Sequence, residues 1–250
     1  MSPPRILLCG DVIGRLNQLF KRVQSANKSA GPFDALFCVG QFFPDSADQL
    51  QEFMDYIEGS GGSQIPLPTY LIGDYGVAAP KVLSTASKNS ANLGFKMDGF
   101  KICDNLFWLR GSGKFSLQGR VRLGLSVAYL SGRQSSNAQQ FGTYSQDDVD
   151  ALRALAEEPG VVDFGVTNRA SASDIPAGFS DSTASDSVVS ELVTEIKPRD
   201  VRSSKLFLGT KGVFYAREPY SNIDAVHVTR FFGLAMVGNK DKQVQFVFSA

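Results

Sequence analysis

Along the first third of the chain, stretches with the apolar pattern of buried strands alternate with stretches that have the apolar spacing of helices. Continuous apolar runs at 5–9, 33–39 and 68–72 have the length of buried strands. Between them, residues 16–23 and 48–57 place apolar side chains on one face of a helix. Strands and helices that alternate in this way predict βαβ units and a parallel sheet.

The pattern changes from about residue 97, where strand-like runs follow one another without helices between them. An edge strand or a loop is expected over 97–104, a short strand over 105–110, and a hairpin from 115–119 and 121–130. This change predicts that a second sheet begins here. Further strands are expected over 161–166, 205–208, 212–217, 226–234 and 242–250, helices over 145–158 and 187–196, and a long surface loop over 168–190.

Composition narrows the class of protein. With 250 residues and 43% hydrophobic residues the chain can bury a large core, and no linker divides it, so one domain over residues 1–250 is expected. The 25 basic and 25 acidic residues cancel, whereas proteins that bind nucleic acid through phosphates usually carry a basic excess; a local basic patch stays open. Three cysteines lie in strand-like runs, which predicts buried reduced thiols, and no apolar run is long enough to cross a membrane.

Three successive strands each end in a glycine followed by a polar residue. These pairs are Gly10-Asp11, Gly40-Gln41 and Gly73-Asp74. The carboxyl ends of parallel strands share one edge of a sheet, and ligands of α/β proteins bind there. Asp11 or Asp74 alone can equally serve the fold by accepting backbone N–H bonds in a turn.

The glycine-ended strands resemble the calcineurin-like metallophosphoesterase layout. A wider set of stretches consists of Cys9-Gly10-Asp11-Val12, Asn105-Leu106-Phe107-Trp108-Leu109, Tyr129-Leu130-Ser131-Gly132, Gly212–Tyr220, His227–Phe231 and Gly238-Asn239. With them the chain resembles more closely the debranchase-like N-terminal region of the CwfJ (Cwf19-like) family. It implies an α/β, metallophosphoesterase-like sandwich of two mixed β-sheets flanked by helices. Residues 119–126, 164–168 and 202–208 depart from the family pattern, and the family's C-terminal histidine-triad-like domains are absent from this chain.

The resemblance also implies a degenerate metal site. At the matched positions the chain keeps Asp11, while Ile13 replaces a histidine, Gln41 the bridging aspartate, and Asp74 and Tyr75 an Asn-His pair. Two-metal phosphoesterases bridge their cations with a carboxylate, and imidazole ligands suit first-row transition metals. Because the chain has one histidine, His227, we expect no catalytic residues, no metal and no cofactor, and the strand-end loops become a candidate binding surface.

Two alternatives stay open. Asp11, Asp74 and Asp45 could hold one hard cation such as magnesium, giving a carboxylate-only phosphodiesterase that acts on RNA. Arg110, Lys114 and Arg133 are candidate RNA contacts, because Phe107, Trp108, Phe115 and Tyr129 lie among them and aromatic and arginine side chains hold single strands. Those aromatic residues can equally be the inward face of strands. A dinucleotide site is disfavoured, since the Gly-x-Gly-x-x-Gly spacing is missing.

The function that the resemblance implies is non-catalytic. We expect a nuclear scaffold or regulator in pre-mRNA splicing and intron-lariat turnover. Its partners would be spliceosomal proteins or the lariat debranching enzyme, with RNA as a further candidate and no membrane.

Overall fold

The computed structural model of the chain describes residues 4–59, 64–73, 78–80, 82–83, 97–118, 124–135, 142–157, 162–171, 185–205, 215–224, 227–239 and 246–249. The first elements are β1 (Arg5–Cys9), α1 (Leu16–Ala30), β2 (Ala35–Val39), the 3-10 helix η1 (Ala47–Leu50), α2 (Gln51–Glu58), β3 (Thr69–Ile72), β4 (Met97–Cys103), β5 (Leu106–Gln118) and β6 (Gly124–Leu130). They are followed by β7 (Arg133–Gln134), β8 (Thr143–Tyr144), α4 (Gln146–Ala156), β9 (Phe164–Ser171), β10 (Ser185–Asp186), α5 (Ser187–Ile196), β11 (Asp200–Lys205), β12 (Tyr215–Ala216), β13 (Tyr220–Ser221), β14 (Val228–Gly233) and β15 (Phe246–Ser249).

The two expected sheets are joined. Among the described strands, thirteen form one mixed sheet. Ten of them follow the path β12-β14-β11-β9-β6-β5-β3-β2-β1-β15, and β10, β13 and β4 pair with β9, β14 and β5 beside it. The strands β7 and β8 pair with each other separately. The first part of the long strand β5 pairs parallel with β3, and its second part pairs antiparallel with β6. The sheet therefore curls through β5 and turns its two halves toward each other.

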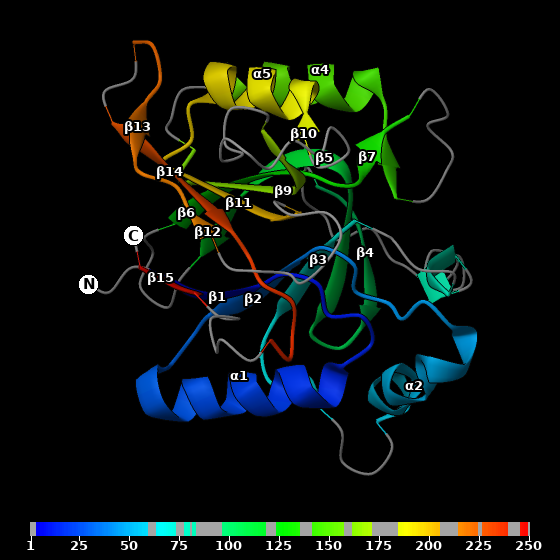
Figure 1. Cartoon of the computed structure of the whole chain (residues 1–250). Coiled ribbons are helices and arrows are strands. Elements are labelled where there is room, and N and C mark those ends of the chain that lie inside the picture. Colours follow the sequence, from blue (N-terminus) through cyan, green and yellow to red (C-terminus); the bar gives the residue numbers. More distant parts are fainter. Residues whose placement is uncertain are drawn as a thin grey trace.

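Three apolar clusters divide the molecule into four layers, with α1 and α2 outside one half of the sheet and α4 and α5 outside the other (Figure 1). Alternate side chains of β1 belong to different clusters: Leu7 packs with α1, and Leu8 packs between the two halves of the sheet. In β6, Tyr129 faces the same middle layer and Leu130 faces α4 and α5. This helix–sheet–sheet–helix order is the expected α/β sandwich.

Glycine allows β5 to continue past the point where the sequence predicts its end. The strand was expected to stop at Arg110 because Gly111-Ser112-Gly113 follows, but it runs to Gln118. Gly111 adopts φ +61°, where an L side chain is strained, and a Cβ on Gly113 would lie 2.8 Å from the Tyr129 ring. The glycines thus bend the strand and admit a tyrosine against it rather than ending it.

The later elements are partly as expected. The helix α5 has the predicted bounds 187–196, and α4 begins with the expected capping box, in which Ser145 and Asp148 bond each other's backbone N–H groups. Of the strand expected over 205–208, Lys205 is the last residue of β11 (Asp200–Lys205), which lies between β9 and β14, and residues 206–208 lie outside the described residues. Of the loop expected over 168–190, residues 168–171 extend β9 and 185–190 form β10 and α5; the remainder lies outside the described residues.

Candidate functional site

The carboxyl ends of β1 and β2 meet at one edge of the sheet, where they place Asp11 beside Gln41. These strands are parallel, with Cys9 opposite Cys38, so the residues that follow them lie together. The backbone N–H of Gln41 donates to Asp11 Oδ1 at 2.8 Å. In return, the N–H groups of Val12 and Ile13 donate to the Gln41 carbonyl at 2.8 and 3.1 Å. Asp11 thus fastens the two loops to each other.

The Gln41 side chain lies where the resemblance places a bridging aspartate, and it supplies N–H donors instead of a carboxylate. Its Nε2 donates to Asp45 Oδ1 at 2.7 Å and to the Phe43 carbonyl at 3.1 Å. Two carboxylates, Asp11 and Asp45, therefore each accept a hydrogen bond from Gln41. Asp11 accepts the backbone N–H of Gln41, and Asp45 accepts its side-chain amide.

A segment near the C-terminus, residues 234–237, closes this edge from the other side, and no sequence pattern predicted it. Gly10 N–H donates to the Ala235 carbonyl at 3.2 Å, and Val237 N–H donates to the Asp11 carbonyl at 2.8 Å. A Cβ on Gly10 would lie 2.6 Å from the Leu234 carbonyl oxygen, so only glycine fits there. Arg15 Nη1 adds a bond of 2.7 Å to the Val237 carbonyl.

Ser131 ties the ends of β3 and β6 to the bend of β5 at Gly111 and was not recognised as a site residue. Gly73 N–H donates to its buried hydroxyl at 2.6 Å, and its own N–H donates to the Gly111 carbonyl at 2.7 Å. Asp74 and Tyr75, which directly follow Gly73 and were predicted to belong to this edge, lie outside the described residues.

Ile13 stands where the resemblance places a histidine, and its backbone is strained. Its φ is +51°, a left-handed conformation that is rare for a β-branched side chain. It lines a groove of about 410 Å³ together with Gly14, Arg15, Gln49, Gln51 and Glu52. The charged groups of this groove serve the fold: Glu52 Oε2 accepts the Asn17 N–H at the start of α1, and Arg15 binds Val237 as above.

The donor set does not fit the two-metal centre of phosphoesterases. The chain's one histidine, His227, is hydrogen-bonded through Nε2 to the Lys197 carbonyl at 2.7 Å. It precedes β14, whereas Ala235 follows that strand, so about 20 Å of strand separates His227 from Gly10. Within the described ranges, no three His, Cys, Asp or Glu side chains converge as metal ligands would.

The thiols behind this edge are structural. Cys9 and Cys38 are buried and their sulfurs lie 3.4 Å apart. Burial raises the pKa of the Cys38 thiol well above its usual value, so it stays protonated. Cys103 is partly exposed, against the expectation that all three are buried; partial burial raises its pKa to about 11. Protonated thiols are poor metal ligands and nucleophiles.

The three candidate RNA contacts lie on β5 and β7. Arg110 is exposed, while Lys114 Nζ donates to the Leu155 carbonyl at the end of α4, at 3.2 Å. Arg133 is placed by its backbone in β7. The aromatic residues among them, Trp108 and Tyr129 in particular, are only 3% and 1% exposed. Stacking of bases on these two rings is thus prevented by burial, and the cations alone remain as candidates.

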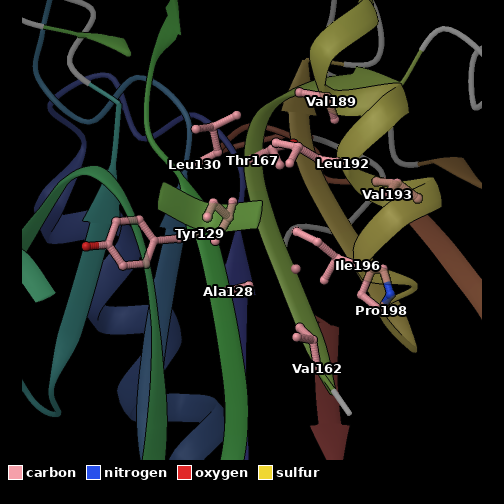
Figure 2. A pocket seen from close by; sticks show the side chains of 12 residues that line it. Ala128, Tyr129, Leu130, Val162, Thr167, Val189, Leu192, Val193, Ile196 and Pro198 are labelled. Atoms are coloured by element: carbon pink, nitrogen blue, oxygen red, sulfur yellow. The ribbon is translucent and has the colours of Figure 1, made fainter. Parts of the chain in front are cut away.

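A second cavity lies between the sheet and α5 (Figure 2). Its volume is about 30 Å³, room for about one water molecule, and side chains such as Leu130, Val162 and Leu192 line it. The Tyr129 ring points away from α5, toward the middle layer. The cavity is a gap in packing and carries no chemistry.

Comparisons with known proteins place the chain among its relatives. No family model matches it. It is 68% identical over 248 residues to "Zinc finger CCCH domain-containing protein 64" of Arabidopsis thaliana, 32% identical over 252 residues to "CWF19-like protein 1 homolog" of Caenorhabditis elegans, and 31% identical over 256 residues to "CWF19-like protein 1" of Homo sapiens. The chain is a CWF19-like homologue. The matches cover 96–97% of this chain but only 39–43% of those relatives, so the chain spans about two fifths of their length.

The solved structures agree on the fold of this CWF19-like chain. The protein TT1561 of Thermus thermophilus superposes with a TM-score of 0.54, 13% identity and 99% coverage of both chains. "GAP50 the anchor in the inner membrane complex of Plasmodium" superposes with a TM-score of 0.51 and 11% identity, covering all of this chain and 79% of the other. At such low identity these likenesses show the fold alone, which is metallophosphoesterase-like. In the described part of the chain, no helix is both long and apolar enough to cross a membrane.

Proposed function

We propose that this chain is a non-catalytic metallophosphoesterase-like module of the nucleus that acts in pre-mRNA splicing and intron-lariat turnover. It works by binding spliceosomal proteins or the lariat debranching enzyme. The CWF19-like relatives support the splicing-related part of this proposal. The observation that carries the non-catalytic part is the pair of hydrogen bonds from Gln41 to Asp11 and Asp45.

These hydrogen bonds support a role without hydrolysis for an electrostatic reason. A two-metal hydrolase holds its cations about 3.5–4 Å apart through anionic and imidazole ligands. At this edge the amide of Gln41 supplies no anion, and each acidic partner already accepts an N–H bond. Loops that no longer hold metal are fixed by their own hydrogen bonds and present a rigid surface, bordered by the groove at Ile13.

The alternative is a carboxylate-only phosphodiesterase. Asp11 and Asp45 both bond to Gln41 and could share one magnesium ion, which prefers oxygen ligands. An assay of branched RNA and of a simple phosphodiester, with manganese and with magnesium, separates the two functions. We expect no turnover above the metal-only rate for the chain or for Asp11→Ala. Turnover that Asp11→Ala abolishes would establish the alternative.

The binding role is tested with purified lariat debranching enzyme and a matched pair of variants. Gln51 lines the groove beside Ile13, and its side chain is hydrogen-bonded to Asp55, one helical turn further on, at 2.9 Å. Gln146 lies on α4, and its side chain is hydrogen-bonded to Asp150 in the same way at 3.0 Å. We expect saturable binding that Gln51→Arg weakens and Gln146→Arg leaves unchanged. If neither variant alters binding, the groove is not the docking surface; if the enzyme does not bind, this partner is wrong.

A further inference from the structure

Helix α1 carries an uncompensated positive charge on its outer face. Lys21 and Lys28 are exposed and Arg22 is half-buried, while the helix from Leu16 to Ala30 contains no acidic residue. Its buried face, which includes Leu19 and Val23, packs on the sheet, so the cations face outward from the outermost layer (Figure 1). The zero net charge of the chain conceals this local excess.

The other helical layer shows how this fold compensates charge elsewhere. Arg153 on α4 pairs with Asp150 at 3.2 Å, Glu191 at 3.1 Å and Glu195 at 2.7 Å. By contrast, none of the ion pairs between described residues involves a cation of α1. Unpaired cations on one helical face attract a polyanion from solution.

The remaining outer side chains of α1 indicate which polyanion fits. They are amides and hydroxyls, namely Asn17, Gln18, Gln24, Ser25 and Ser29, and all are exposed. Lysine and arginine with such groups are the side chains that contact phosphates and sugars. Aromatic side chains often anchor a protein interface, and a membrane-bound helix needs an exposed apolar face. The exposed positions of α1 offer no large apolar side chain for either.

We propose that the outer face of α1 binds the phosphodiester backbone of RNA, without reading its sequence. Lys21 and Lys28 are seven residues apart and so lie about 10.5 Å apart along the helix axis, with the hydroxyl of Ser25 between them. The proposal deepens the proposed function, because it moves the RNA contact from Arg110, Lys114 and Arg133 to α1.

The test measures anisotropy of a labelled single-stranded RNA of about 16 nucleotides as salt rises from about 50 to 200 mM. Three phosphate contacts predict a slope of log K against log salt of about −2 for the unchanged chain. The variant Lys21→Gln/Arg22→Gln/Lys28→Gln should bring this slope close to zero and weaken binding at low salt on the order of tenfold.

A control with the same change in net charge is Lys101→Gln/Arg199→Gln/Arg230→Gln, at three exposed positions away from α1. It should keep the slope of the unchanged chain.

Equal losses in both variants would show that only net charge matters and would overturn the proposal, as would an unchanged slope in the α1 variant. Binding of polyglutamate in preference to RNA would overturn it too, and would assign α1 to an acidic protein instead. Turnover in the phosphodiester assay would refute the proposed function and leave the α1 result untouched.

Discussion

The strand-end edge and the outer face of α1 lie close together in the chain but differ in how their polar groups are satisfied. At the edge, Asp11 and Gln41 bond each other's loops, and Gln41 also bonds Asp45. On α1, Lys21 and Lys28 are exposed and have no ion pair among the described residues. Groups already paired inside a protein hold its shape, whereas unpaired surface charges are available to a ligand. The hydrogen bonds at the edge therefore hold a protein-docking surface in shape, while the exposed cations of α1 are available to the RNA that we propose binds there.

The largest expected effect is on the edge itself, through Gly10→Ala. The new methyl group would lie 2.6 and 2.7 Å from the carbonyl oxygens of Leu234 and Ala235, which are backbone atoms that cannot move aside cheaply. We expect a loss in the free energy of unfolding of about 3 kcal/mol or more, measured by urea denaturation. Gly124→Ala is the control, since its Cβ would meet only ordinary contacts at 3.4 Å or more. Equal stability of both variants would contradict the closed edge.

How much of the fold the sequence predicts depends on how local the signals are. The bounds of α5 and the cap at Ser145 follow from residues a few positions apart, and both were predicted correctly. The part of β11 before Lys205 was not predicted, because Arg202-Ser203-Ser204-Lys205 has no apolar period; its pairing with β9 and β14 forms the strand. Likewise β5 passes through Gly111 only because distant groups pack around the bend.

A smaller effect is expected from Asp11→Ala, which leaves the Gln41 N–H without its acceptor. We expect a loss of about 1–3 kcal/mol in the free energy of unfolding, and a smaller loss for Asp11→Asn, which keeps an acceptor oxygen. Gln41→Ala removes the side-chain bonds and keeps the backbone N–H that Asp11 accepts, so we expect a loss of about 1 kcal/mol for it. A metal site without its ions would respond oppositely, because removing a carboxylate from it relieves repulsion. Increased stability of Asp11→Ala would therefore contradict a purely structural role for this carboxylate.

The candidate site was predictable only where adjacent strands determine it. Asp11 and Gln41 come together because they follow neighbouring parallel strands, as the glycine-ended pattern indicates. Ser131 and residues 234–237 were missed, since they reach the edge from strands far along the chain. A hydroxyl and backbone carbonyls carry no sequence signal that links them to Gly73 or Gly10.

The smallest effect on stability is expected on α1. The variant Lys21→Gln/Arg22→Gln/Lys28→Gln should change the free energy of unfolding by no more than about 0.5 kcal/mol per substitution, because surface changes without partners rarely do more. Thermal denaturation of this variant and of Asp11→Ala, together with the RNA titration, tells the two regions apart. The α1 variant should lose RNA binding and keep its stability, whereas Asp11→Ala should lose stability and keep RNA binding. A large loss of stability in the α1 variant would show that its cations serve the fold.

Metal binding at equilibrium is the decisive measurement for the strand-end edge. The chain and its Asp11→Ala variant are dialysed against manganese and, separately, magnesium, and the bound metal is measured by elemental analysis. We predict no saturable uptake of a pair of ions by either protein, because Gln41 supplies an amide and no carboxylate beside Asp11 and Asp45. Two ions bound to the chain and lost from Asp11→Ala would contradict the non-catalytic role.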